Sequence, residues 1–392
     1  MKYLLLVLLV LSLSFATFGS ARQVIERTWT ISNQGPFQFN GALVVNNSNQ
    51  HVLSIITEPY MDQRTDEEGV IWLNYSGSGN VRLKAIAIVD VDYNTNITSD
   101  ATQPKNSVTF TNLTEPDERI TFQATRVSNS SSLKTIRNVV DWVHGYITYD
   151  LSYWGRSKSA REVFTEGRGV CVEYSHLLIS MVESLGFKAR YVSGYVYTEA
   201  WQPHAWVEIS VPGYGWLPAD PTFNQIGTLD NSHIAIDYGP DQASIFDSIL
   251  TQDQMAILSV EDQLSTNFAS EDTKGVDLDI ALENNTVIFE IDNTNSYFVY
   301  GTFVYSMLNT QEEKLLLLAP NERLQIRKVL DQSQFDQNFV YSVPVIAWFN
   351  DAKANNTFEI KPESNGPYNN SGSCLSSFVL LLCFSLIFFH RI

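Results

Sequence analysis

The chain has 392 residues, 44% of them hydrophobic and 12% aromatic, and its 25 Lys and Arg residues against 43 Asp and Glu residues give a formal net charge of −18. A chain of this length exceeds one ordinary hydrophobic core, so two or three domains are expected. The negative charge argues against nucleic acid or an anionic membrane surface as a partner.

Residues 1–21 have the composition of a secretory signal peptide. They combine one Lys, a long apolar run and the small residues Gly19, Ser20 and Ala21, which is the pattern of a cleaved leader. An uncleaved membrane anchor is the alternative, although the apolar run is shorter than the roughly 20 residues that span a bilayer. Eight Asn-x-Ser/Thr sequons agree with export; they begin at Asn46, Asn74, Asn96, Asn112, Asn129, Asn284, Asn355 and Asn369.

Residues 22–126 are predicted to form a β domain. Stretches such as VRLKAIAIV (81–89) and TFTNLT (109–114) alternate in polarity and are separated by turn clusters such as SGSGN. Alternation with a period of two, interrupted by turns, is typical of antiparallel strands, here as a small sandwich.

Residues 127–240 are predicted to form an α+β domain. Apolar residues first fall at helical spacing, and SAREVFTEG then contains a capping box, with Ser159 three residues before Glu162. Another helix is expected to begin at Cys171 and to end at Gly186. The segments ARYVSGYVY and HAWVEISV follow as strands, so the helices precede the sheet.

The C-terminal part divides by composition into four segments. Residues 241–274 are rich in acids and are predicted to be a linker with a helical piece around 252–263. Alternation returns in 275–360, which predicts a second β domain, again a sandwich. Residues 361–376 are rich in Pro, Gly, Ser and Asn and are predicted to be a stalk. Residues 377–392 form a hydrophobic tail.

The tail predicts attachment to a membrane by one of two routes. The segment FVLLLCFSLIFFHRI is just long enough to cross a thin bilayer when some preceding residues are included. The small residues Ser371, Gly372 and Ser373 and the thiol of Cys374 resemble a sorting signal, at which a tail is removed and a lipid or glycolipid attached. Both routes remain open, and both place the protein at the cell surface.

Cys171 lies within GRGVCVEYSHLL and has no expected disulfide partner. The other two cysteines, Cys374 and Cys383, lie beside or inside the tail. A helix N-terminus favours a thiolate through its free backbone N–H groups and its dipole. The same N–H groups can bind an oxyanion. Cys171 is therefore a candidate nucleophile.

A cysteine nucleophile needs a base, and spacing selects His204. The turn VPGYG lies between HAWVEIS and WLPADP, and a hairpin centred on Pro212 would place His204 directly opposite Asp220. Directly opposed residues have their side chains on one face, with Cβ atoms about 5 Å apart. The Asp220 carboxylate could then orient the His204 ring while its other nitrogen faces Cys171.

Other interpretations exist for each of these residues taken alone. A single buried cysteine is most often an inert small hydrophobe, and Asp220 before Pro221 could simply begin a turn. Cys171, His204 and Asp220 could also ligate zinc, but no second cysteine or close histidine pair supplies the usual ligand spacing. The joint occurrence of the three residues in this order favours catalysis, with no metal or cofactor.

Three segments resemble the transglutaminase-like cysteine-enzyme superfamily, whose core is papain-like. They are YITYDLSYWGRSKSAREVF, GRGVCVEYSHLLISMVESLGFKARYVSGYV and HAWVEISVPGYGWLPADPTF, which together cover about a quarter of the chain. The resemblance implies an α+β core between two β-sandwich-like domains that lie outside it.

The resemblance also implies roles for individual residues. Cys171 would be the nucleophile, His204 the base and Asp220 the orienting acid, in agreement with the reading from spacing. A second oxyanion donor would come from an aromatic or amide side chain upstream of the cysteine, and the candidates are Trp154, Tyr153 and Trp142. Arg190, Gly194 and Trp206 would be scaffold around the cleft.

These observations predict an exported, surface-anchored cysteine enzyme. It would act on amide or peptide bonds of an extracellular protein or peptide through a thioester, with hydrolysis or acyl transfer as the second step. The alternative is a non-catalytic surface binding or adhesion protein that retains a transglutaminase-like domain.

Overall fold

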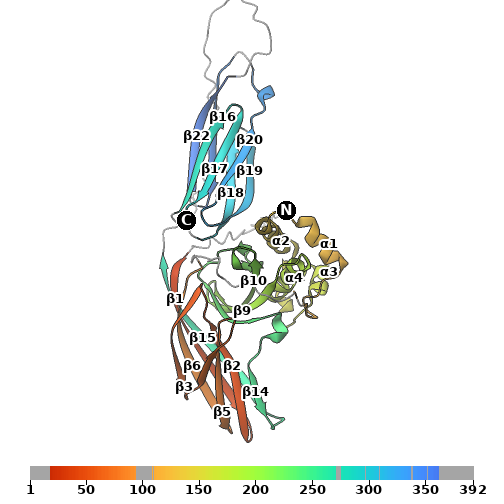
Figure 1. Cartoon of the computed structure of the whole chain (residues 1–392), viewed down its shortest axis with the longest axis vertical. Coiled ribbons are helices and arrows are strands. Elements are labelled where there is room, and N and C mark those ends of the chain that lie inside the picture. The colour runs from red at the N-terminus through yellow and green to blue at the C-terminus, as the bar shows by residue number, and fades with distance from the viewer. Residues whose placement is uncertain are drawn as a thin grey trace, which may run out of the picture. The chain divides into compact units, whose positions relative to one another are not determined.

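A computed structural model of the chain describes residues 18–93, 108, 110–270, 275–295, 297–308, 310–336, 339–350 and 352–361 (Figure 1). Most of the predicted signal peptide and stalk, and the whole hydrophobic tail, lie outside these residues. Within the described part, no helix is both long and apolar enough to cross a membrane. The chain forms two compact units: residues 1–274 with 296–300, and residues 275–295 with 301–392.

The first unit contains a sandwich of two antiparallel sheets. One sheet has the order β15–β1–β6–β3 and the other the order β14–β2–β5–β4. The strands are β1 (Phe18–Ser32), β2 (Pro36–Val45), β3 (Gln50–Glu58), β4 (Asp62–Thr65), β5 (Val70–Ser78), β6 (Val81–Val91), β14 (Ser248–Thr251) and β15 (Ile257–Ser270). Along β6, buried and half-buried residues alternate, so the predicted period of two places one face in the core. Trp29 and Phe39 meet in that core, with ring centroids 5.2 Å apart.

The segment 241–274 is not a linker, contrary to the prediction from its acidic composition. After the short helix η2 (Gln242–Ser244), it supplies strands β14 and β15, which pair with β2 and β1. At least one of its acidic residues stabilises the fold, because the buried carboxylate of Asp262 accepts a hydrogen bond of 2.8 Å from Arg27 Nε. The expected helical piece around 252–263 is therefore a turn followed by a strand, because pairing with β1 outweighs local propensity.

Replacing Arg27 tests how much its buried ion pairs stabilise the sandwich. Its guanidinium lies 2.8 Å from Asp262 and 3.5 Å from Asp247, and all three side chains are about nine-tenths buried. Arg27→Met leaves two buried carboxylates without their counter-charge, and we expect a loss of about 3–5 kcal/mol in unfolding free energy. Urea unfolding measures this, with Arg22→Met as the matched control. Arg22 pairs with Asp90 at the surface, so its replacement is expected to cost less than about 1 kcal/mol. Equal losses in the two variants would contradict the buried network.

A five-stranded antiparallel sheet and four α-helices complete the first unit. The sheet has the order β12–β11–β10–β9–β13, and Figure 1 shows α1, α2 and α3 grouped around α4 beside β9 and β10. The α-helices are α1 (Glu118–Val127), α2 (Ser132–Tyr146), α3 (Ala160–Glu166) and α4 (Cys171–Ser184). The strands and the short helix are β7 (Thr148–Tyr149), β8 (Arg168–Gly169), β9 (Ala189–Tyr197), β10 (Trp201–Val211), β11 (Gly215–Asp220), β12 (Gln225–Ile226), β13 (His233–Gly239) and η1 (Leu151–Tyr153).

The helical part begins earlier than the predicted boundary at residue 126. Asp117 caps α1 by accepting hydrogen bonds from the backbone N–H groups of Arg119 and Ile120. The stretch TFTNLT, predicted as a strand, contains a turn at 112–114 instead. Its alternation is too short to specify a strand, and the acidic cap after it gives the stronger local signal.

The sandwich and the central sheet share one hydrophobic core. Val192, Trp206 and Ile234 of the central sheet belong to the same buried cluster as the sandwich interior. The side chain of Gln50, on β3, also forms two hydrogen bonds of 2.8 Å with the backbone N–H and C=O of Ala235 on β13. The two parts of this unit are therefore joined by both apolar and polar contacts.

The second unit is also built from two sheets. They have the orders β16–β17–β20 and β19–β18–β21–β22, and Phe289 and Phe303 pack between them with centroids 5.4 Å apart. The elements are β16 (Val276–Glu283), β17 (Thr286–Asn293), β18 (Val299–Met307), β19 (Thr310–Leu318), β20 (Arg323–Val329), η3 (Gln332–Gln334), β21 (Tyr341–Phe349) and β22 (Ala352–Ile360). The predicted class, a mixed α and β core with flanking sheet-rich regions, is confirmed.

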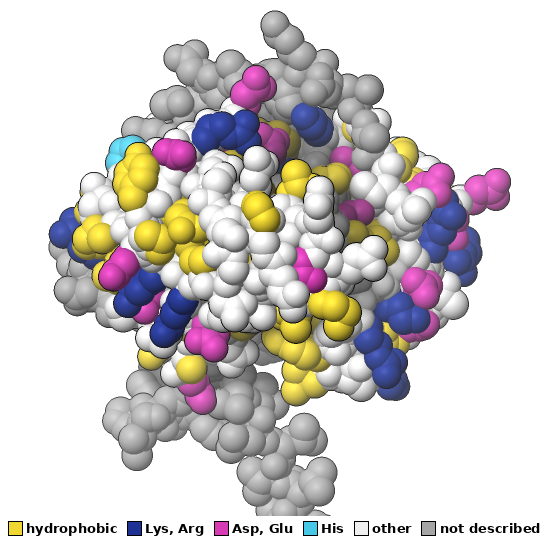
Figure 2. All heavy atoms as spheres, turned by 90° about the horizontal axis from the view of Figure 1, so that it is seen from below, with side chains coloured by type: hydrophobic (Ala, Val, Ile, Leu, Met, Phe, Trp, Pro, Cys, Tyr) yellow, Lys and Arg dark blue, Asp and Glu magenta, His cyan; other side chains and the backbone are white. Residues whose placement is uncertain are grey.

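The surface carries interspersed charges. On the face shown in Figure 2, Lys and Arg side chains lie next to Asp and Glu side chains and are separated by hydrophobic and uncharged ones. Mixed charge of this kind, with a net charge of −18 for the chain, favours solubility.

Candidate active site

The sequence GRGVC forms a tight connection that ends one helix and begins the next. Gly167 ends α3 with φ +63°, in the left-handed region that favours glycine. At Gly169 a Cβ atom would lie 2.2 Å from Cβ of Glu173, so no larger residue fits there. The buried Glu173 carboxylate accepts hydrogen bonds from the N–H groups of Val170 (2.9 Å) and Lys158 (3.1 Å). These contacts fix Cys171 as the first residue of α4.

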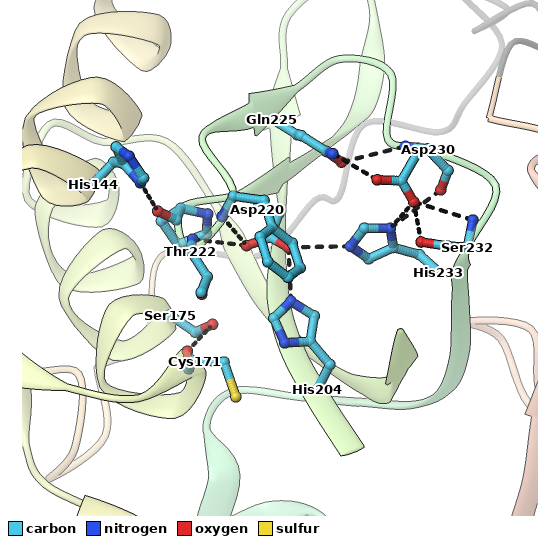
Figure 3. Close-up of polar contacts among 12 residues, drawn as sticks. His144, Cys171, Ser175, His204, Asp220, Thr222, Gln225, Asp230, Ser232 and His233 are labelled. Atoms are coloured by element: carbon cyan, nitrogen blue, oxygen red, sulfur yellow. Dashed lines mark hydrogen bonds and ion pairs between the residues drawn. The ribbon is translucent and has the colours of Figure 1, made fainter. Parts of the chain in front are cut away.

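Cys171 lies where a nucleophile at a helix start is expected. The first N–H groups of a helix have no partner within the helix, so the backbone beside the sulfur can bind an anion. The side chain is only 4% exposed. Figure 3 shows its sulfur beside the His204 ring.

His204 and Asp220 form the buried pair predicted from the hairpin, but in a different register. The ladder pairs Val207 with Ala219 and Val211 with Gly215. The turn is therefore centred on Gly213, which has φ +82°, and the predicted direct opposition of His204 and Asp220 is wrong by two residues. A shift of two keeps both side chains on one face, and His204 Nε2 still lies 2.7 Å from Asp220 Oδ2.

Asp220 is held as a carboxylate by four donors. Its Oδ1 accepts hydrogen bonds from the N–H groups of Thr222 (2.7 Å) and Phe223 (3.2 Å). Its Oδ2 faces His204 Nε2 at 2.7 Å and His233 Nε2 at 3.1 Å. Burial works to raise the pKa of Asp220, but the charge of His204 and the hydrogen bonds from both histidines outweigh it and hold the pKa well below its usual range.

Asp220 and Cys171 both favour protonation of the His204 ring. Burial works to lower the pKa of His204, but the charge of Asp220 and hydrogen bonds to Asp220 and to Cys171 raise it to about 10. Because Nε2 is engaged with Asp220, Nδ1 is the nitrogen left to exchange a proton with the sulfur.

His233 is a member of this cluster that the sequence did not reveal. It is fully buried at the start of β13. Besides Asp220 it contacts Asp230, with Nδ1 3.0 Å from Oδ1 (Figure 3). The alternation of HIAIDY could have indicated a strand, but nothing local identifies Asp220 as a partner 13 residues away.

The three predicted oxyanion donors have other surroundings. Trp142 stacks on Tyr146, with centroids 4.4 Å apart. The Tyr153 hydroxyl donates a hydrogen bond of 2.5 Å to Glu166. Trp154 follows η1 and is 55% exposed.

Tyr149 is a further candidate for the second oxyanion donor. Its strand β7 pairs in parallel with β8, directly before Cys171. Burial, and then the negative charges of Cys171 and Asp220, raise the pKa of Tyr149 to about 12. The phenol is half-exposed, and its strand lies beside the segment that leads into Cys171. It would remain a neutral donor at physiological pH.

The cluster suits protons better than a metal ion. His204, Asp220 and His233 offer ligand atoms within 4.8 Å of one another. Ligands of tetrahedral zinc, at about 2.0–2.1 Å from the metal, are roughly 3.3 Å apart. The spacing of 2.7 Å between His204 and Asp220 is instead that of a charge-assisted hydrogen bond.

The scaffold residues implied by the resemblance lie in the central sheet. Arg190 donates hydrogen bonds of 2.9 and 2.5 Å to Glu208 on the neighbouring strand. At Gly194, which pairs with His204, a Cβ atom would lie 2.0 Å from the carbonyl oxygen of Ile234. Trp206 is fully buried beside the His204 ring.

Comparison with known proteins identifies the family of this part of the chain. A model of the transglutaminase-like superfamily matches residues 119–221, which confirms the resemblance inferred from the sequence. Uncharacterized proteins of Mycobacterium leprae and Mycobacterium tuberculosis are similar to part of the chain. The first is 26% identical over 126 residues, 30% of this chain and 44% of the relative. The second is 27% identical over 128 residues, 29% of this chain and 40% of the relative. The matches thus span less than half the length of these relatives.

Two solved structures are also similar to the chain. A candidate cysteine protease from Cytophaga hutchinsonii has a TM-score of 0.48 and 20% identity, and the match covers 65% of this chain and 93% of that one. The periplasmic domain of TgpA from Pseudomonas aeruginosa has a TM-score of 0.30 and 14% identity, covering 53% and 91%.

Proposed function

Since residues 119–221 form a transglutaminase-like domain, we propose that the protein is a cysteine enzyme that breaks amide or peptide bonds through a thioester. Cys171 is the nucleophile, His204 the base and Asp220 the acid that orients the base. The observation that carries the proposal is the buried contact of 2.7 Å between His204 and Asp220, together with the influence of Cys171 on the pKa of the same ring. Neither a structural cysteine nor a binding surface requires this chain of contacts.

The first half of the proposed reaction forms the thioester. The thiol proton of Cys171 passes to His204 Nδ1, and the sulfur attacks the carbonyl carbon of the bound amide. The negative charge on the carbonyl oxygen is stabilised by the N–H group of Cys171 and by the Tyr149 hydroxyl. His204 then returns the proton to the leaving nitrogen, and the C–N bond breaks.

The second half releases the acyl group. His204 takes a proton from the incoming nucleophile, which attacks the thioester carbonyl, and the thiolate leaves and is reprotonated. Water gives a carboxylic acid, and a primary amine gives a new amide. We propose water as the acceptor, because many relatives of this kind outside animals resemble proteases or amidases more than crosslinking enzymes.

One assay tests both the activity and the acceptor. The full chain is incubated with a Gln-containing protein and a fluorescent primary amine. We expect new peptide termini, or newly formed acid groups, in the products, with no label above that given by Cys171→Ala. Incorporation of label would show amine transfer instead. Neither product, together with slow alkylation of Cys171, would favour the non-catalytic binding role.

Export and surface attachment are part of the proposal and rest on the sequence alone. The leader-like composition of residues 1–21 and the hydrophobic segment 377–392 support them. Mass spectrometry of the mature chain isolated from cell envelopes tests both ends. An intact leader on a chain found only inside the cell would contradict export.

A further inference from the structure

The strongest unassigned feature is the buried histidine behind Asp220. We propose that His233 is a positioning residue that is held as an imidazolium. Its ring bridges the carboxylates of Asp220 and Asp230, so the negative charge of Asp220 acts on His233 as well as on His204, which it orients. The catalytic consequence rests on the proposed function, whereas the protonation state does not.

The protonation state follows from the partners of the two ring nitrogens. Nδ1 of His233 lies 3.0 Å from Oδ1 and 3.1 Å from the carbonyl oxygen of Asp230. Nε2 lies 3.1 Å from Oδ2 of Asp220. All three partner atoms are acceptors, and a neutral imidazole has only one N–H group. A neutral ring would therefore bring a lone pair against a buried carboxylate on one side.

Both carboxylates accept hydrogen bonds from backbone or amide N–H groups, which favours their ionised forms, so neither is suited to supply the missing proton. Asp220 has donors at both oxygens, as described above. Asp230 also accepts hydrogen bonds from Gln225 Nε2 (2.6 Å) and from the backbone N–H group of Ser232 (3.1 Å). Burial works to raise the pKa of Asp230, but the charge and hydrogen bond of His233 outweigh it and lower the pKa to about 2. For His233 itself, burial is outweighed by Asp230 and Asp220, and the pKa rises to about 9.

His176, in the same unit, is a buried histidine whose contacts require a neutral ring. It is equally buried, but Nδ1 faces the carbonyl oxygen of Lys158 (2.8 Å) and Nε2 accepts a hydrogen bond from the N–H group of Gln242 (3.2 Å). One acceptor and one donor require a neutral ring, and burial lowers the pKa of His176. The two histidines form a matched pair with opposite expected charges.

A permanent charge on His233 changes the basicity of His204. The two rings are 5.6 Å apart and share one oxygen of Asp220. A positive charge at that distance opposes protonation of His204 by on the order of one to two pH units. The other titratable groups facing His233 are Asp230 and Tyr93, whose ring meets it edge-on. His233 thus keeps His204 from becoming too basic to lose its proton during turnover.

The test is ¹⁵N NMR of the full chain labelled at histidine. At pH 7.5 we expect both His233 nitrogens to show imidazolium shifts, whereas His176 shows the shifts of a neutral ring. A neutral His233 at this pH overturns the proposal. Signals are assigned by their loss in single His→Gln variants. If His233→Gln does not fold, its signals in the wild type are assigned by exclusion from the other five variants.

The effect on His204 is measured in a Cys171→Ala background, where the thiol no longer acts on the ring. Adding His233→Gln is expected to raise the titration midpoint of His204 by on the order of one to two pH units. His176→Gln, the matched control, is expected to leave the midpoint unchanged. An unchanged or lowered midpoint with His233→Gln overturns the positioning role. Neither measurement needs catalytic turnover. If the protein proves inactive, the proposed function is wrong, but the spectra still decide the protonation state of His233 and its effect on His204.

Discussion

Cys171→Ala is expected to lower kcat/KM for amide hydrolysis by a factor of about 10⁴–10⁶. Loss of the nucleophile reduces the rate by a factor of this size in serine and cysteine enzymes. Without the sulfur no thioester forms, and the N–H groups at the start of α4 can only bind the substrate carbonyl. The measurement is the steady-state rate on a peptide that the wild type cleaves. Trapping of the acyl-enzyme by mass spectrometry should give a thioester adduct on the Cys171 peptide of the wild type alone.

The fold should be almost unaffected by this substitution. A buried cysteine behaves as a small hydrophobe, so the melting temperature is expected to change by only a few degrees. The matched control is Ser180→Ala on the same helix: Ser180 is fully buried and its hydroxyl has no hydrogen-bond partner. This variant should keep full activity. Retention of activity by Cys171→Ala would remove the basis for a thioester mechanism.

Asp220→Asn is expected to lower kcat/KM by about 10³–10⁴. The amide has nearly the same shape, but it lacks the charge that stabilises the His204 imidazolium, and its NH₂ group can force the ring into the wrong tautomer. His204 is then less basic and titrates at lower pH, so the acid limb of the pH–rate profile should shift to lower pH. The profile of kcat/KM between pH 5 and 10 measures both effects.

Stability gives an independent readout of the same carboxylate. Because the pKa of Asp220 is depressed in the folded state, its contribution to stability is present above the unfolded value of about 3.9 and is lost as pH falls below it. Asp220→Asn should remove this part of the acid-dependent slope and destabilise the protein at pH 7.

Asp237 is the control for the charge at Asp220. It lies on the same sheet and is also buried, but burial raises the pKa of Asp237 to about 7. Asp237→Asn therefore removes a carboxylate that is costly to ionise, and activity and stability at pH 7 should change little. Equal losses from Asn at both positions would mean that the charge on Asp220 has no special role.

The candidate site could be predicted to the extent that its information is local. The start of α4 is encoded within a few residues, because Gly169 and Glu173 act on neighbouring backbone. Asp220 was found through the hairpin even though the register was wrong, since a two-residue error preserves the face. His233 and Tyr149 were missed, because their relation to the site depends on strands β13 and β7 meeting other parts of the chain.

The fold, too, could be predicted only where the information is local. The alternation of residues 81–89 predicted a strand, and β6 is one, because a period of two can be recognised from adjacent residues alone. In the segment 241–274, seven acids stand against one Lys, and the explanation for Asp262 is Arg27, which lies 235 residues earlier. Composition could not distinguish a solvated linker from a strand whose acid is neutralised by a distant residue.

The pairing of β15 with β1 has a consequence for how the protein can be divided. The chain leaves the sandwich after β6 and returns to it at β14, so the helices and the five-stranded sheet are an insertion within the sandwich. A fragment cut at residue 240 would strip the outer strand from both sheets and leave the edges of β1 and β2 open to association with other chains. Any piece that carries Cys171 and keeps both sheets of the sandwich intact must therefore include residues 18–270.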